Sequence, residues 1–164
     1  MPRLRLLRHA KSSWDDPKRS DEERPLNKRG RRDAPRMARW LVENTEPPRK
    51  LVISPARRTR ETADAIIAAF GLPGDAVVID KRLYLADPGM ILTVATEHGF
   101  DNVLVIGHNP GLHDVACRLA AKHEVPRLEH FPTAAYLELD FKGPVTPGSG
   151  VISRFITPKE LPDA

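Results

Sequence analysis

The sequence has almost no cysteine, few aromatic residues and no long hydrophobic run. Cys117 is the only cysteine among 164 residues, so an internal disulfide cannot form, which fits a reducing compartment. No apolar run is long enough to span a bilayer, and Arg3, Arg5 and Arg8 interrupt the apolar stretch where a signal peptide would have its core. These absences predict a soluble cytoplasmic protein with no membrane partner.

A continuous stripe of positive charge is also missing. The formal net charge is only +4, and acidic residues such as Asp15, Asp16 and Asp21 are interleaved with the basic ones. Aromatic residues, which stack on bases in many nucleic-acid-binding proteins, make up 5% of the sequence. We therefore expect no nucleic-acid partner, whereas a smaller anionic ligand fits the mild positive charge.

The order of the apolar runs predicts the fold. At 164 residues the chain is expected to form one domain, residues 1–164, with its own core. Short apolar or alternating runs predict strands at residues 4–7, 51–53, 77–79, 103–107, 135–141 and 151–157. The last two flank a Gly/Pro loop and predict a hairpin, while helical patterns separate the others. This alternation predicts a three-layer α/β/α fold, with a mostly parallel central sheet and helices on both faces.

Start and stop signals place the helices between these strands. Asn27 can cap a helix with an apolar face that includes Met37 and Leu41, although Pro35 is expected to kink it or to move its start to about Asp33.

Two further helices have their own signals. Ser54 and Pro55 are expected to open the next helix, which Gly71 ends, and Asp87 and Pro88 are expected to open a third.

The segment from Lys11 to Leu26 is long, charged and without a helix or strand pattern. Loops of this length in compact domains are usually functional or disordered, and this one follows directly on Arg8 and His9. We therefore expect a flap beside the site.

Basic or imidazole side chains lie just beyond three of the predicted strands. Arg8 and His9 follow the first strand, His108 follows the run at 103–107, and Arg58 lies in the first turn of the helix after the run at 51–53. The carboxyl ends of strands in an open α/β sheet form the ligand crevice, so these side chains are expected to meet there.

Arg58 is distinguished from its neighbours by its lack of a local acidic partner. Arg57 has Glu61 four residues later, and Arg60 has Asp64 at the same spacing, so both can form ordinary surface ion pairs. Arg58 faces Thr62 instead and is left free to bind an anion near the N-terminus of its helix.

Together these residue types predict phosphoryl transfer. One histidine is expected to attack phosphorus in line and form a phosphohistidine enzyme, while two arginines and the second histidine neutralise the phosphate oxygens. These cations would supply the charge that magnesium supplies elsewhere, so neither a metal nor a cofactor is expected. His113 lies five residues after His108, which is off the spacing of helical zinc ligands.

Three motifs resemble those of the histidine phosphatase superfamily, also called the phosphoglycerate mutase-like fold. They are Leu7-Arg8-His9-Ala10, Ser54-Pro55-x-x-Arg58-x-x-x-Thr62 and Gly107-His108-Asn109-Pro110. The segments from Arg8 to Trp14 and from Arg24 to Gly30 resemble its SixA-like group, the protein phosphohistidine phosphatases. The resemblance spans nearly the whole chain. It implies that His9 is the nucleophile, that Arg8 and Arg58 clamp the phosphate, and that His108 is the second histidine.

The chain departs from the superfamily pattern at two points. The usual Arg-His-Gly is Arg8-His9-Ala10 here, and no glutamate stands in Arg82-Leu83-Tyr84-Leu85-Ala86, where many members carry a general acid. An alkoxide leaving group needs a proton, whereas a phosphorylated imidazole protonated on its other nitrogen leaves as a neutral ring. The missing acid therefore favours a phosphoramidate substrate, unless Asp87 or a flap residue supplies the proton.

The resemblance implies a phosphohistidine-bearing partner protein, for instance a phosphotransfer domain of a signalling relay. Two alternatives remain open at this point. One is a phosphatase of small phosphate esters, and the other is a non-catalytic module that binds phosphate or nucleic acid with the same cations.

Overall fold

A single mixed sheet organises the fold of this computed structural model, which describes residues 1–162. The strand order across the sheet is β3-β2-β4-β1-β5-β6. The strands are β1 (Arg3–Arg8), β2 (Lys50–Ile53), β3 (Val77–Ile79), β4 (Val103–Gly107), β5 (Tyr136–Asp140) and β6 (Val151–Ile156). β5 runs against its neighbours β1 and β6, and all other pairings are parallel, so five strands share one direction. The predicted hairpin at 135–157 is confirmed.

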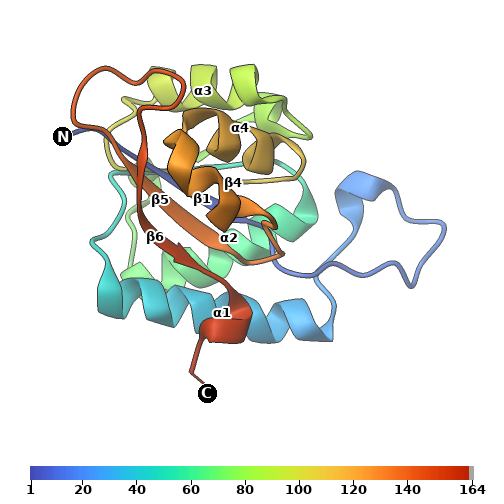
Figure 1. The fold of residues 1–164 in the computed structure, drawn as a ribbon. Helices are drawn as coiled ribbons and strands as arrows, with labels where there is room; N and C mark the ends of the chain where they lie inside the picture. Colours follow the sequence, from blue (N-terminus) through green and yellow to red (C-terminus); the bar gives the residue numbers. More distant parts are fainter. Residues whose placement is uncertain (163–164) are drawn as a thin grey trace.

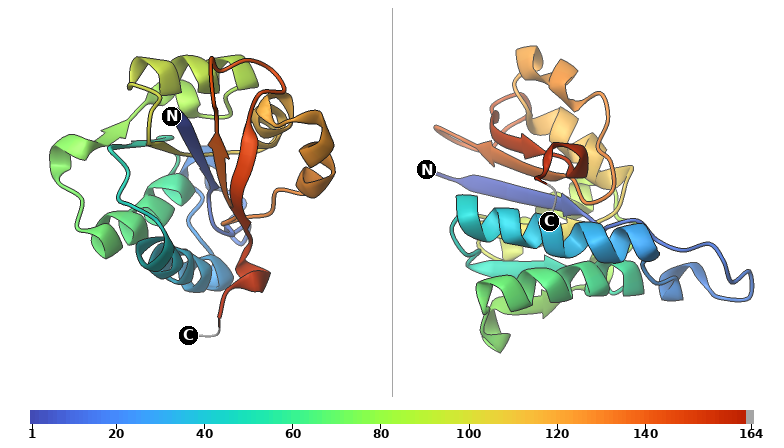
Figure 2. Two further views of the ribbon diagram at one scale, coloured as in Figure 1. Left: turned by 60° about the vertical axis from the view of Figure 1, so that its left-hand side comes forward. Right: turned by 90° about the horizontal axis from the view of Figure 1, so that it is seen from below.

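Helices cover both faces of the sheet, as the three-layer prediction required (Figure 1). The helices α1 (Lys28–Asn44) and α2 (Arg57–Phe70) pack on one face, and α3 (Pro88–Glu97) and α4 (Gly111–Leu119) pack on the other (Figure 2). Short 3-10 turns lie at Asp21–Glu23, Gly74–Ala76, Lys81–Leu83, Lys122–Leu128 and Pro158–Glu160. None of the helices within residues 1–162 has both the length and the apolar character needed to cross a membrane.

The alternation of side chains along the strands divides the core into two layers. Leu7 of β1 packs with Met37 and Leu41 of α1, whereas Leu6 packs on the opposite face with residues such as Val115 of α4. Successive side chains in a strand point to opposite faces of the sheet, and both faces are covered by helices. Every inner strand therefore needs apolar residues at odd and at even positions. This is why the strands appear in the sequence as continuous apolar runs.

The central strand β1 also carries a buried charge. Arg5 is 1% exposed, and its Nε donates to the Tyr136 hydroxyl at 2.6 Å, while its guanidinium also donates to the Glu46 carbonyl at 3.0 Å. The Tyr136 hydroxyl in turn donates to Glu138 at 2.8 Å. Removing one partner of such a network is costly, because the remaining charge stays buried without compensation.

The first helix begins earlier than Asp33, which was one of the two alternatives that the sequence left open because of Pro35. α1 starts at Lys28, directly after Asn27, whose side chain accepts a hydrogen bond from the Gly30 amide at 2.9 Å. It continues through Pro35, so a start near Asp33 was wrong. The cap and the burial of Ala34 and Met37 outweigh the hydrogen bond that proline removes.

The second helix begins later than its sequence signals indicated. α2 starts at Arg57 after Ala56, and Ser54 is not its cap because the Ser54 hydroxyl turns toward His108. Gly71 ends this helix with φ +64°, as predicted.

One of the two predicted ion pairs of α2 is confirmed, and the other was wrong. Arg57 contacts Glu61 at 3.4 Å, as expected from their spacing. Arg60 does not pair with Asp64; its nearest carboxylate is Glu23, at 3.7 Å.

The segment from Lys11 to Leu26 leaves the end of β1 as an extended flap (Figure 1). Its two ends pair at a bridge between Ser12 and Leu26, and the Asn27 amide donates to the Lys11 carbonyl at 2.9 Å. Trp14 is 71% exposed and lies over the Arg24 guanidinium at 3.4 Å. The flap is therefore tied at its base to the strand that carries His9.

Gly30 allows the first turn of α1 to lie against this flap base. A Cβ at Gly30 would lie 2.1 Å from the Lys11 carbonyl oxygen, which is a backbone atom that cannot rotate away. We predict that Gly30→Ala lowers the free energy of unfolding by about 2 kcal/mol, because overpacking outweighs the gain in helix propensity. Gly74→Ala is the control, since no heavy atom lies within 4 Å of a Cβ there. Denaturant unfolding checks this, and equal stability of the two variants would contradict it.

Candidate active site

The four side chains predicted to form the site line one cavity at the carboxyl ends of the strands. Arg8 and His9 come from the end of β1, Arg58 from the first turn of α2, and His108 from the residue after β4; the cavity measures about 320 Å³. His9 is 6% exposed, and Arg58 and His108 are each 3% exposed. The two imidazole rings lie 5.4 Å apart. The structure thus brings all four residues together, while their roles remain predictions.

The His9 ring is held in one tautomer by its own loop. Its Nδ1 lies 2.7 Å from the Ala10 carbonyl oxygen. Because a carbonyl oxygen can only accept, Nδ1 carries the hydrogen, and Nε2 has a free lone pair. The Ala10 amide donates to the Thr62 hydroxyl at 3.0 Å, and that hydroxyl donates to the Arg58 carbonyl at 2.7 Å. Thr62 therefore fixes the His9 loop to the helix that carries Arg58.

His108 is oriented in the opposite sense by Arg58 and Ser54. The Arg58 Nη2 lies 3.4 Å from Nδ1 of His108, and because a guanidinium can only donate, Nδ1 is the acceptor. Nε2 then carries the hydrogen and donates to the Ser54 hydroxyl at 2.6 Å. The sequence suggested a helix cap for Ser54, yet Ser54 follows β2 as His108 follows β4. That shared position at a strand end is the signal that could have identified it.

Both histidines are neutral in this site. Burial lowers the pKa of His9 to about 3, and the nearby His108, Arg58 and Arg8 act in the same direction. Burial likewise lowers the pKa of His108 to about 3, with Arg58 as the next cause. The role expected for His108, which is to neutralise phosphate oxygens together with the two arginines, remains a prediction. The positive charge belongs to the guanidinium groups.

Two guanidinium groups in the cavity have buried nitrogens without a partner among residues 1–162. The unpaired atoms are the Nε of Arg8 and the Nε of Arg58. Arg8 donates to the Phe131 carbonyl at 3.1 Å through one terminal nitrogen only, and burial, then the Arg58 charge, lower its pKa. Buried polar groups are normally paired, so the site is built to meet an acceptor-rich anion.

Arg58 has an acidic partner after all, but one that is distant in sequence. Its terminal nitrogens donate to the Asp21 carbonyl oxygen at 2.7 Å and to the Asp21 carboxylate at 3.1 Å. Tyr84 donates to the same carboxylate at 2.5 Å, and Arg24 donates to it at 3.1 Å. Sequence spacing gave no indication of this contact, because it joins the flap to α2 across the fold.

The Asp21 carboxylate is ionised. Burial raises its pKa, but the hydrogen bonds from Tyr84 and Arg58, the Arg58 charge and the bond from Arg24 outweigh burial and lower the pKa to about 2. In this arrangement Asp21 holds Arg58 and has no proton to donate near neutral pH.

The remaining candidates lie outside the cavity. Asp87 accepts from the Met90 amide at 2.8 Å as the cap of α3, and His113 contacts the Leu128 carbonyl at 2.5 Å. Cys117 is half-buried beside the core. In the part of the chain that the structure describes, no three His, Cys, Asp or Glu side chains are grouped to hold a metal ion.

The protonation of the two imidazoles can be observed directly. We predict that the imidazole ¹⁵N signals of His9 and His108 keep their neutral-form positions from pH 8 down to pH 5, because both pKa values lie near 3. In the chain unfolded by denaturant, the same rings should titrate near ~6.5. The unfolded chain then binds more protons, so the free energy of unfolding should fall as the pH drops from ~6.5 toward 3. A midpoint near ~6.5 for either ring in the folded protein would contradict this.

Known proteins share both the sequence pattern and the fold. Residues 4–84 match the family model of the histidine phosphatase superfamily (branch 1). Phosphohistidine phosphatase SixA of Escherichia coli is 30% identical over 108 residues, which cover 64% of this chain and 66% of that protein. An uncharacterized chloroplastic protein of Arabidopsis thaliana is 47% identical over 128 residues, covering 72% of this chain but only 59% of that relative.

A crystal structure assigned to SixA from Agrobacterium tumefaciens superimposes with a TM-score of 0.81. The two chains are 26% identical, and the superposition covers 95% of this chain and 97% of the other. The family model spans the first two motifs, which contain Arg8 and Arg58. The chain therefore belongs to the histidine phosphatase superfamily.

Proposed function

We propose that this protein is a phosphohydrolase that removes phosphate from phosphohistidine on a partner protein, through a covalent phosphohistidine at His9. The observation that carries the proposal is the free Nε2 of a neutral His9, fixed beside two guanidinium groups that have buried, unpaired Nε atoms. A neutral imidazole is a nucleophile, and paired guanidinium groups match the oxygens of a phosphate. The similarity to SixA supports this choice of substrate.

In the first step, the His9 Nε2 attacks phosphorus while the bond from phosphorus to the substrate nitrogen breaks. The substrate imidazole is protonated on its other nitrogen and leaves as a neutral histidine. Arg8 and Arg58 offset the negative charge on the phosphate oxygens throughout, because their positions are fixed before the substrate arrives. This role needs no metal, since the charge is supplied by the two side chains.

In the second step, water attacks the phosphorus of phospho-His9 and releases inorganic phosphate. The bond to Nε2 breaks, and the ring returns to its neutral form with Nδ1 still donating to Ala10. The sum of the two steps is phosphohistidine plus water giving histidine plus phosphate.

The local acids fit a phosphoramidate better than an ester. Asp21 is ionised and bonded to Arg58, and Asp87 caps α3, so neither is poised to protonate an alkoxide. A phosphorylated imidazole needs no such donor. This agreement between the leaving group and the site favours phosphohistidine over sugar phosphates.

Loss of the nucleophile should abolish turnover. We predict that His9→Ala releases no phosphate from a protein carrying phosphohistidine, whereas wild type does so in the presence of a chelator and leaves a sugar phosphate almost untouched. His130→Ala is the matched control and should behave as wild type, because the His130 side chain is 83% exposed and outside the cavity.

Other outcomes of this assay discriminate between the functions. Turnover of the ester alone would retain His9 as the nucleophile but contradict the substrate. Phosphate release from neither substrate would contradict the enzyme and favour a module that only binds phosphate.

The hydroxyl that orients His108 should matter for the rate. Ser54→Ala leaves a buried N–H of His108 without its acceptor, which costs about 1–3 kcal/mol. Because that cost falls on the transition state, kcat should decrease about fivefold to 150-fold. Ser149→Ala, in the exposed loop before β6, is the control. Steady-state kinetics check this prediction, and an unchanged kcat in a folded Ser54→Ala protein would refute it.

A further inference from the structure

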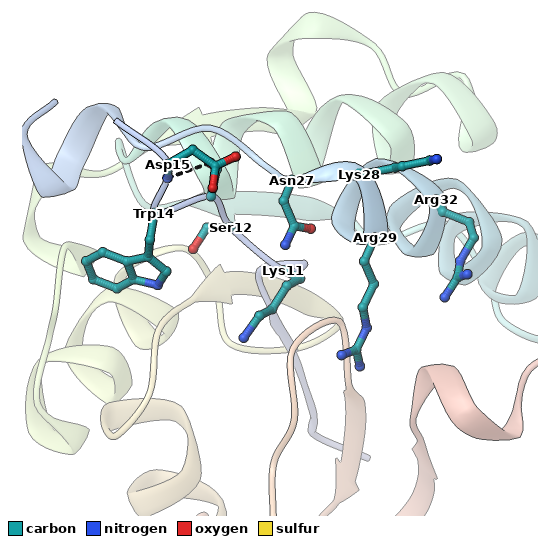
Figure 3. Close-up of a pocket in the computed structure, with 9 residues that line it drawn as sticks. Lys11, Ser12, Trp14, Asp15, Asn27, Lys28, Arg29 and Arg32 are labelled. Atoms are coloured by element: carbon teal, nitrogen blue, oxygen red, sulfur yellow. Dashed lines mark hydrogen bonds between the residues drawn. The ribbon is translucent and has the colours of Figure 1, made fainter. Parts of the chain in front are cut away.

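A second, larger hollow lies next to the catalytic cavity and is lined by basic side chains. This basic groove measures about 790 Å³ and is lined by Lys11, Ser12, Ser13, Trp14, Asp15, Asn27, Lys28, Arg29 and Arg32. It lies between the base of the flap and the first two turns of α1. Figure 3 shows Lys11, Arg29 and Arg32 extending on the same side, from two segments distant in sequence.

The groove has a local excess of positive charge. Four of its lining residues are basic, and among residues 1–162 Asp15 is its one acidic lining residue. Arg29 and Arg32 each lie 3.5 Å from the buried Asp33 carboxylate, but Arg36 shares the same carboxylate at 3.1 Å. A single negative charge therefore faces three guanidinium groups. The side chains of Arg29 and Arg32 remain 52% and 66% exposed, so they are available to a partner.

The groove adjoins the catalytic cavity. Lys11, Ser12 and Trp14 line both hollows. These shared residues place the groove within reach of a protein that has its phosphate at His9. The groove is also more than twice as large as the catalytic cavity, at about 790 Å³ against 320 Å³. It offers more room than a phosphate group alone would use.

Trp14 provides an apolar anchor at the junction of the two hollows. Its ring is 71% exposed and is stacked on Arg24, which is itself 7% exposed and donates to the Ser12 hydroxyl at 2.7 Å. A tryptophan held in place in this way is typical of the residues that dominate protein–protein interfaces. Single-stranded nucleic acids are instead bound on several successive aromatic rings, and Trp14 is the one aromatic residue lining the groove.

We propose that the basic groove binds an acidic surface segment of the partner protein, next to its phosphorylated histidine. This inference rests on the proposed function. It adds to it that the partner protein is acidic around its phosphohistidine. Carboxylates of the partner would face Arg29 and Arg32 while its phosphohistidine lies against His9. Such a groove raises the rate of encounter with acidic partners and selects among phosphohistidine proteins by their flanking residues.

The test compares two substrates that differ only outside the phosphate. One is a synthetic peptide with phosphohistidine flanked by glutamates, and the other is free phosphohistidine. The variant is Arg29→Gln/Arg32→Gln, which leaves Arg36 to pair with Asp33. The matched control is Arg49→Gln/Arg118→Gln. It removes two exposed arginines, one before β2 and one in the last turn of α4. Both lie near the amino ends of the parallel strands, away from the groove at the carboxyl ends.

The groove variant is expected to lose about fivefold or more in kcat/KM on the acidic peptide at low salt, and the loss should shrink at high salt. Its kcat/KM on free phosphohistidine should stay at the wild-type level. The control variant should keep the wild-type kcat/KM on both the acidic peptide and free phosphohistidine. Equal rates of all three proteins on the peptide would overturn the proposal. An equal loss on both substrates would also overturn it, because the damage would then lie in the catalytic cavity.

A binding measurement keeps this test independent of turnover. The unphosphorylated glutamate peptide is titrated into each protein, and the change in tryptophan fluorescence is followed in a Trp40→Phe background, where Trp14 is the remaining tryptophan. If wild type hydrolyses neither substrate, the proposed function fails, but about fivefold weaker binding by the groove variant alone would still support an acidic ligand. Equal binding by all three proteins would overturn the groove. Tighter binding of a DNA oligonucleotide of the same charge would overturn it as well, in favour of nucleic acid.

Discussion

The structure depends on holding the guanidinium groups of Arg8 and Arg58 in one cavity with buried, unpaired nitrogens. Arg58 is 3% exposed, and burial, followed by the Arg58 charge, lowers the pKa of Arg8. Like charges repel more strongly where the dielectric constant is low, so this arrangement is costly for the fold unless an anion is present. Three features of the fold hold the two guanidinium groups in this arrangement. Parallel strands deliver their ends to one edge, α2 presents Arg58 in its first turn, and Asp21 reaches across from the flap to hold it.

The neutrality of the two histidines follows from the same constraint. Burial, and then the positive charges already in the cavity, lower the pKa values of His9 and His108, so both rings stay unprotonated. In the proposed mechanism, His9 therefore needs no separate base to activate it. The carbonyl of Ala10 and the hydroxyl of Ser54 then decide which nitrogen of each ring faces which neighbour. A phosphate dianion entering the cavity would reverse the electrostatic balance and favour proton uptake by His108.

Much of this arrangement was predictable from sequence because it depends on local rules. Apolar runs indicated the strands, Asn27 and Asp87 indicated two helix starts, and the strand-end rule brought Arg8, His9 and His108 together. What could not be predicted depends on contacts between distant segments. Asp21 meets Arg58 across 37 residues, and Ser54 meets His108 across 54. The contact with His108 also explains why Ser54 is not a helix cap, because the Ser54 hydroxyl bonds the buried imidazole instead of the backbone of α2.

The central claim is that His9 forms a covalent bond to phosphorus through Nε2. The most direct measurement is rapid quenching of the wild-type protein during turnover of a phosphohistidine protein, followed by ³¹P spectroscopy and peptide mapping under alkaline conditions. The account predicts a phosphate on Nε2 of His9, in the peptide that also contains Arg8, appearing and disappearing at rates compatible with turnover. Phosphate release at the full rate with no phosphate on His9, or with phosphate on another side chain, would contradict it.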